Sequence, residues 1–271
     1  MAFLTETPPI YGVPEVVADG VRRLVAPNAG PMTYHGTNTW LVETGDGTAV
    51  IDPGPDDPAH VAAILAWAPR LSRIFLTHTH PDHVGAVAAV RTATGAPVLG
   101  WGVPWLNDFA PDIALADGEE VAGLVALHTP GHASDHLSYA RAGVGLFSGD
   151  HVMSWSTSVV SPPDGDMAAY MQSLRMLLAR DDRVFFCGHG PVLPEPEKLM
   201  RALLVHRVGR ENAVLDALGA GRGAVADIVD ALYRDLDAGL KKAAARNVLA
   251  HLLKLATEGR AREHEGTWFT T

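Results

Sequence analysis

The sequence of 271 residues contains a single cysteine, which excludes an internal disulfide and is typical of a reducing compartment. No apolar run approaches the roughly 18 residues that a membrane-spanning helix needs. The first residues lack both the basic region and the apolar segment of a secretory signal. From these absences we expect a cytoplasmic protein without a membrane partner.

Basic side chains are also scarce, because 21 Lys and Arg face 31 Asp and Glu, giving a net charge of −10. Hydrophobic residues make up 47% of the chain, which is ample for a core. A chain of this length can hold one large domain and one small one. The sequence leaves the oligomeric state open, a homodimer included.

The densest group of chemically active side chains is the run His78, His80, Asp82 and His83, which follows the apolar residues 74–76. On an extended strand the period of two points His78 and His80 the same way. Pro81 can then open a helix whose first turn brings Asp82 and His83 into the same space. Imidazole and carboxylate groups that converge at a strand end suit zinc, iron or manganese. The alternative is a polar turn with unrelated histidines.

Three later segments repeat one pattern, a short apolar strand that ends in a glycine-bearing loop with one candidate ligand. The candidate ligands are His132, Asp150 and His189. Binding groups often occupy such junctions, where rigid elements hold the loops. Two metal ions, each with about three protein ligands and a shared hydroxide, would account for all seven residues.

This series of residues resembles the ligand motif of the metallo-β-lactamase superfamily. The resemblance implies a four-layer αββα sandwich. It also implies one metal on His78, His80 and His132, a second on Asp82, His83 and His189, and Asp150 as the bridge between them. Residues 36–42 and 51–54 are similar to the opening hairpin of the superfamily. There Asp52 would be a buried hydrogen-bond acceptor that supports the site.

Alternation of apolar runs with short Gly- and Pro-bearing loops predicts a layered α/β domain over residues 1–194. We expect strands at 21–26, 39–44, 49–52, 74–78, 98–101, 121–127, 137–140, 144–148 and 184–187. We expect helices at 58–67, 82–94 and 167–179.

From residue 195 to residue 271 the pattern becomes helical. Helices are expected at 197–218, 225–233 and 241–257, followed by a hairpin over 259–269. Three helices and a two-stranded wing are the order of a winged-helix domain. This tail, with His206-Arg207-x-x-Arg210-Glu211, is similar to the β-lactamase-like protein 2 branch of the superfamily, as is the segment 161–170.

The ligand set predicts a zinc-dependent hydrolase, with iron or manganese as alternative metals. Two ions lower the pKa of a bridging water, so that hydroxide is available near neutral pH to attack a carbonyl carbon or a phosphorus. Asp82 is the expected catalytic residue, because its carboxylate can reach both metal and water. His35, His136 and Asp164 are candidates for substrate binding, although a supporting role is favoured for His136.

The bond that is cut stays open at this stage, because the fold does not decide it. The branch resemblance implies cleavage of single-stranded RNA. A thioesterase, lactonase or β-lactamase-type hydrolase of a small molecule is the alternative, and a winged-helix regulatory binder with a vestigial site is a third reading.

Charge distribution argues against an extended nucleic-acid groove. Residues 1–194 carry 9 basic and 20 acidic side chains, a net charge of −11, and residues 195–271 carry 12 and 11, a net charge of +1. The candidate recognition helix offers only Lys241, Lys242, Arg246 and Lys254. A phosphate polymer would meet a repulsive field over most of this surface. We therefore expect the tail to form a wall of the substrate cleft.

Overall fold

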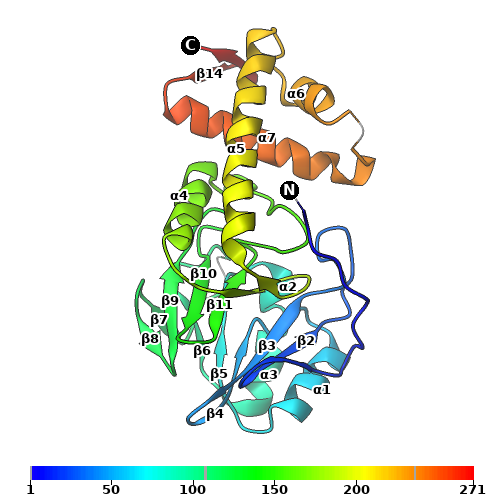
Figure 1. Cartoon of the computed structure of the whole chain (residues 1–271), viewed down its shortest axis with the longest axis vertical. Helices are drawn as coiled ribbons and strands as arrows, with labels where there is room; N and C mark the ends of the chain where they lie inside the picture. Colours follow the sequence, from blue (N-terminus) through cyan, green and yellow to red (C-terminus); the bar gives the residue numbers. More distant parts are fainter. Residues whose placement is uncertain (1, 107–108, 235) are drawn as a thin grey trace.

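The computed structural model describes residues 2–106, 109–234 and 236–271. Figure 1 shows two packed sheets with helices outside them, and a long helix, α5 (Pro196–Gly219), that leads to a small helical domain at the C-terminal end. Among the described residues, no helix combines the length and the apolar character needed to cross a membrane.

The first sheet has seven strands in sequence order, of which β1 to β4 are antiparallel and β5 to β7 continue parallel to β4. The strands are β1 (Glu15–Ala18), β2 (Val21–Val25), β3 (Asn38–Thr44), β4 (Gly47–Ile51), β5 (Leu71–Phe75), β6 (Val98–Trp101) and β7 (Ile113–Leu115). The connection from β4 to β5 passes through α1 (Pro58–Trp67), and that from β5 to β6 passes through α2 (Pro81–Val84) and α3 (Val87–Thr94). Asp57 begins α1 by accepting a hydrogen bond from the His60 amide, and left-handed Gly95 ends α3.

The second sheet has six strands in the order β13-β12-β11-β10-β9-β8. They are β8 (Glu120–Val121), β9 (Leu124–His128), β10 (Leu137–Arg141), β11 (Gly145–Gly149), β12 (Val184–Cys187) and β13 (Leu193–Pro194). Strands β11 and β12 are parallel and are joined through α4 (Met167–Leu178), which the side chain of Asp166 caps.

Alternation along the strands creates the four layers. In β3, Trp40 and Val42 face the second sheet, whereas Leu41 between them packs under α1 and α3. In β12, Phe186 faces the first sheet and Phe185 packs under α4 and α5. One apolar layer therefore lies between the sheets and one under the helices on each side, which confirms the expected αββα sandwich.

The C-terminal domain has its own apolar core and the predicted order of a winged helix. After α5 come α6 (Val225–Leu232), a short 3₁₀ turn (Ala238–Leu240), α7 (Lys241–Thr257), β14 (Ala261–His264) and β15 (Thr267–Thr270). Glu211 of α5 is only 8% exposed and lies 2.7 Å from Lys254 Nζ and 3.1 Å from Arg260 Nη1. This ion-pair cluster links α5 to α7 and to the turn that precedes β14.

Three predicted elements were wrong in their extent. The single strand expected over 121–127 is interrupted at Ala122 and Gly123, where the chain turns from β8 into the antiparallel strand β9. The strand expected over 74–78 ends at Phe75, so His78 and His80 lie on the loop beyond it. The single helix expected over 82–94 is two helices, separated at Gly85 and Ala86; a side chain at Gly85 would not fit, since its Cβ would lie 2.7 Å from the Asp56 amide nitrogen. The short edge strands β1, β7 and β13 were not predicted, because their apolar runs are too short to be recognised in the sequence.

Candidate metal centre

Loops at one edge of the two sheets bring the seven predicted ligands together. His78, His80, Asp82 and His83 follow β5, whereas His132, Asp150 and His189 follow β9, β11 and β12. They form three groups whose donor atoms lie within 4.8 Å of one another, namely His78-His80-His132, His78-His83-Asp150 and Asp82-His83-His189. The strand-end positions that the sequence predicted therefore converge in space.

The first triad consists of three ring nitrogens that face a common point. His80 Nδ1 lies 3.0 Å from His78 Nε2 and 3.0 Å from His132 Nε2. Zinc–nitrogen bonds of about 2.0–2.1 Å in tetrahedral geometry separate two nitrogens by about 3.4 Å, so the spacing is close to that of a ligand set. One cation can satisfy all three lone pairs at once.

The second triad combines nitrogen and oxygen donors. His189 Nε2 lies 3.2 Å from Asp82 Oδ2, and His83 Nε2 lies 3.7 Å from the same oxygen. Asp150 stands between the two triads, since its carboxylate is 3.3 Å from His189 Nε2, 3.5 Å from His83 Nε2 and 3.7 Å from His132 Nε2. This placement fits a residue that bridges two cations.

Each of the five histidines is held by a hydrogen bond at the ring nitrogen that faces away from the cluster. The outer partners are Thr77 Oγ1 for His78, Asp164 for His80, Asp52 for His83, the Val159 carbonyl for His132 and the Gly36 carbonyl for His189. An N–H donated outward leaves the inner nitrogen with a free lone pair. In its neutral form, each ring is thus held in the tautomer that can bind a metal.

Asp52 is the support that the family resemblance implied. It is 1% exposed and has a left-handed backbone with φ of 53°. Its carboxylate accepts hydrogen bonds from the Thr77 amide at 2.7 Å, from Thr77 Oγ1 at 2.7 Å and from His83 Nδ1 at 2.9 Å. One buried carboxylate therefore positions His83 and, through Thr77, also His78.

Buried polar atoms without a protein partner show that the residues fit a metal. The described part of the chain has several buried side-chain atoms without a hydrogen bond, and three of them belong to this cluster, namely His83 Nε2, His189 Nε2 and Asp150 Oδ1. An unpaired buried polar atom is costly, so a native fold tolerates such a group only where something else satisfies it. A set of imidazoles and carboxylates is the donor chemistry of zinc, iron and manganese.

The two triads differ in the direction in which the pKa values of their histidines are shifted. Burial and the neighbouring His80 lower the pKa of His132 to about 4, so that ring is neutral. Burial also disfavours the charged form of His189, but Asp150 and Asp82 outweigh it and raise its pKa to about 9. The pKa of Asp82 falls to about 2, because His83 and His189 outweigh its burial. Without a metal, protons at the second triad balance the carboxylates that a cation would neutralise.

The three predicted substrate contacts lie in different surroundings. His136 is 0% exposed, and its two nitrogens lie 2.9 Å from Thr129 Oγ1 and 3.2 Å from the Asp150 amide nitrogen. That environment favours the supporting role. The ring of His35 lies on the loop before Gly36, but its Nε2 is 3.3 Å from the Glu6 carbonyl and so contacts the N-terminal segment.

Asp164 is 8% exposed, and both carboxylate oxygens have partners inside the protein. Oδ1 accepts hydrogen bonds from the Ser134 amide and hydroxyl, and Oδ2 lies 3.2 Å from His80 Nε2. We interpret it as a positioning residue for His80 in place of the expected substrate contact. Sequence reasoning could not find the carbonyl of Val159, since a backbone acceptor leaves no trace in residue type.

The architecture and site define a two-sheet α/β protein with a histidine- and aspartate-rich metal centre and a winged-helix tail. Residues 32–100 and 101–189 match the metallo-beta-lactamase superfamily, and residues 224–268 match the beta-lactamase associated winged helix domain. The chain belongs to the metallo-β-lactamase superfamily, a family of hydrolases.

Among its relatives is the beta-lactamase-like protein 2 homolog of Drosophila melanogaster, 32% identical over 91% of each chain. Another is atrochrysone carboxyl ACP thioesterase AgnL7 of Paecilomyces divaricatus, 31% identical over 97% of this chain and 88% of the relative. The metallo-beta-lactamase family protein TTHA1429 of Thermus thermophilus shares the fold, with a TM-score of 0.78 and 22% identity over 93% of this chain and 99% of that chain.

Proposed function

We propose that the chain is a binuclear metal hydrolase that cleaves a thioester or a similarly activated ester of an apolar acyl group. The proposal of a hydrolase rests on one observation: the two triads face each other and Asp150 lies between them. His78, His80 and His132 would hold one divalent cation, Asp82, His83 and His189 the other, and Asp150 would contact both. Zinc is the first choice, with iron and manganese as alternatives.

When bound by such a set, divalent cations activate water near neutral pH and polarise the electrophilic oxygen of a substrate. The protein contributes the orientation of the reactants. The Asp82 side chain is 30% exposed, whereas that of Asp150 is 9% exposed, so Asp82 lies on the open side of the centre. A carboxylate there can orient the attacking water and hold its proton, which is the role proposed for Asp82.

An exposed apolar loop anchored near the centre supports an acyl substrate. Val103, Trp105 and Leu106 expose 75%, 43% and 43% of their surface on the loop after β6. The amide of Leu106 lies 3.2 Å from Thr79 Oγ1, between the two histidines of the first triad in sequence, and the amide of Trp105 lies 3.0 Å from Asp135. The loop is therefore anchored to the segment that carries the ligands.

The cationic residues of α7 also favour an acyl substrate over RNA, because three of the four already pair with groups of the protein itself. Lys241 pairs with Asp230 at 2.9 Å, Lys254 contacts Glu211 and Glu258 at 2.7 Å, and Arg246 donates to the Pro162 carbonyl. Such pairs leave little charge for phosphates. Cleavage of single-stranded RNA remains the second candidate, which the resemblance to the β-lactamase-like protein 2 relatives favours.

Metal analysis and a substrate panel test the proposal. Purified protein is expected to hold close to two transition-metal ions per chain. It is then offered an acyl thioester, a lactone, a cephalosporin, a p-nitrophenyl phosphodiester and a single-stranded RNA, with Asp82→Asn as the matched control. Turnover of the thioester that the control loses supports the proposal. No more than one ion, or turnover confined to RNA, contradicts it.

A further inference from the structure

The segment 158–164 lies between the metal centre and the C-terminal domain and contacts both. Toward the centre, the Val159 carbonyl accepts a hydrogen bond from His132 Nδ1 at 2.7 Å, and Asp164 lies 3.2 Å from His80 Nε2. The Ser158 hydroxyl donates to the Asp150 carbonyl at 2.6 Å. Two histidines of the first triad therefore depend on this one segment for their orientation.

The opposite edge of the same segment is held by the C-terminal domain at alternate residues. The Ser158 carbonyl accepts a hydrogen bond from Arg207, the Val160 amide donates to Asn247 Oδ1 at 3.1 Å, and the Pro162 carbonyl accepts one from Arg246 at 3.0 Å. Contacts thus alternate along the backbone: residues 158, 160 and 162 contact the tail, and residue 159 contacts a candidate ligand.

Two of the three anchoring side chains, Arg207 and Asn247, also support each other. Arg207 on α5 is 2% exposed, donates to Asn247 Oδ1 at 3.2 Å and lies over the Tyr170 ring of α4 at 5.0 Å. The Asn247 amide donates to the Ala243 carbonyl at 3.1 Å, which fixes its oxygen toward Arg207 and Val160. This bonding pattern gives the contact a defined geometry.

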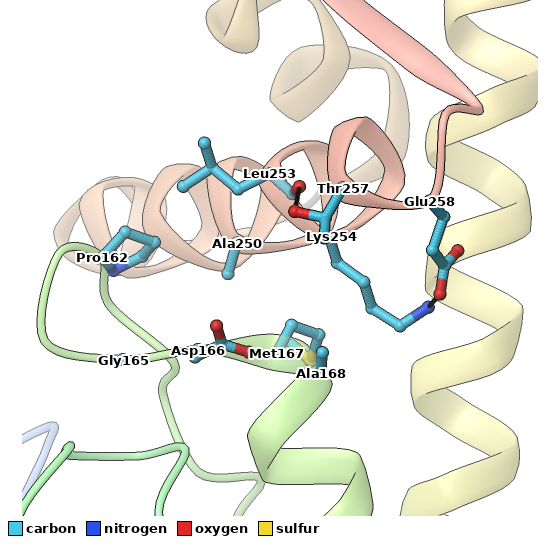
Figure 2. A pocket seen from close by; sticks show the side chains of 10 residues that line it. All are labelled: Pro162, Gly165, Asp166, Met167, Ala168, Ala250, Leu253, Lys254, Thr257 and Glu258. Atoms are coloured by element: carbon cyan, nitrogen blue, oxygen red, sulfur yellow. Dashed lines mark hydrogen bonds and ion pairs between the residues drawn. The ribbon is translucent and has the colours of Figure 1, made fainter.

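Hydrogen bonds carry much of this contact, because a cavity of about 130 Å³ separates α7 from the start of α4. Figure 2 shows Met167 and Ala168 on one wall and Ala250 and Leu253 on the other, with Pro162 at one end. Apolar packing across this gap is incomplete, and the loss of a polar anchor is not compensated by close contact.

We propose that the winged-helix domain positions the metal centre: Arg207, Asn247 and Arg246 fix the segment 158–164, and this segment orients His132 and His80 for metal binding. The inference rests on the proposed metal site. It assigns the tail a role in metal affinity that does not require contact between the tail and any substrate.

Stepwise binding of Zn²⁺ to the metal-free full chain, measured by chelator competition, tests this role. Asn247→Ala removes the acceptor of both Val160 and Arg207, whereas Asn247→Asp retains it. Arg246→Ala removes the exposed anchor with little risk to folding, and Lys242→Ala is the control on the same helix. Variants His78→Ala and His189→Ala identify which binding step belongs to which triad.

Asn247→Ala and Arg246→Ala are expected to weaken the first-triad step about tenfold, the lower end of the 10–100-fold range for loss of a partner that orients a ligand. Asn247→Asp and Lys242→Ala should keep the wild-type affinity, and the step that belongs to His189 should not change. Equal weakening of both steps, or no weakening in a folded Asn247→Ala and Arg246→Ala, overturns the inference. A wild type that binds no Zn²⁺ refutes the proposed function instead.

Discussion

Substitution of Asp52 by Asn tests whether hydrogen bonds that hold the candidate ligands are needed for metal binding, because Asp52 is not itself a candidate ligand. The carboxylate accepts three hydrogen bonds on two oxygens, and it contacts none of the positions that would receive a metal. Asn offers one oxygen and one amide. If the Asn oxygen keeps the hydrogen bond from the Thr77 amide, the NH₂ group faces Thr77 Oγ1 and His83 Nδ1. The N–H of the Asn side chain would then point at the N–H of His83.

Two outcomes relieve that conflict, and both are measurable. The His83 ring can move its proton to Nε2, which removes the lone pair that faces the metal, or the Nδ1–H can stay unpaired in the core. The first costs about 10–100-fold in metal affinity at the second triad. The second costs about 1–3 kcal/mol of folding stability for a buried unsatisfied donor.

Chelator competition with Zn²⁺ and urea unfolding followed by tryptophan fluorescence measure both quantities on one preparation. Asp46→Asn is the matched control, because it removes a carboxylate that pairs with Arg73 on the surface and is 51% exposed. An Asp52→Asn protein with two tightly bound ions and unchanged unfolding would refute the reasoning that the outer hydrogen bonds set the tautomer.

Asp82→Asn should lower turnover of any true substrate by roughly 10²-fold or more while leaving the fold intact, since positioned acid–base chemistry is lost; near-normal kcat would reject its role. The pKa of Glu211 is lowered to about 2, because the contacts of its carboxylate with His251 and Lys254 outweigh its burial. Its contribution to the free energy of unfolding, about 1–3 kcal/mol, should be complete above pH 4.5 and should be lost as the pH falls toward 2. Glu211→Gln should remove this pH dependence from the urea unfolding midpoints. Gly188→Ala should disrupt metal binding, because the new Cβ would lie 2.2 Å from an Asp150 oxygen. Gly209→Ala, in open space on α5, should instead raise stability by about 0.5–1 kcal/mol in the same assay.

Residue type and spacing were enough to predict that the seven candidate ligands converge, because they are chemically distinctive and each follows a strand that apolar runs reveal. Apolar runs and Gly- and Pro-bearing loops predicted a layered α/β domain, whereas the four-layer sandwich was implied by the family resemblance; in the structure, Trp40, Leu41 and Val42 alternate between two of its apolar layers. The winged helix followed from the order of its elements. These features are local in sequence, and the resemblance placed them in one fold.

The contacts that hold the ligands were beyond sequence reasoning, since they join segments far apart in the chain through backbone atoms or long side chains. Val159 uses only its carbonyl, and Asn247 reaches a segment 87 residues earlier. Asp164 was assigned to substrate, because its residue type could not reveal that His80 and Ser134 occupy its oxygens. Edge strands of two or three residues likewise carry too little periodicity to detect.

Helix α5 belongs to two apolar cores at once (Figure 1). Near its start, Leu199, Met200 and Leu203 pack with α4 under the second sheet, and near its end Val214 and Leu218 lie in the core of the winged helix. Ending the chain at residue 194 would strip three large apolar side chains from the sandwich, each worth about 1.5–3 kcal/mol, a loss comparable to the whole stability of a domain. The catalytic part is therefore not a transferable module, and recombination or truncation at this boundary should yield insoluble protein unless the first turns of α5 are carried along.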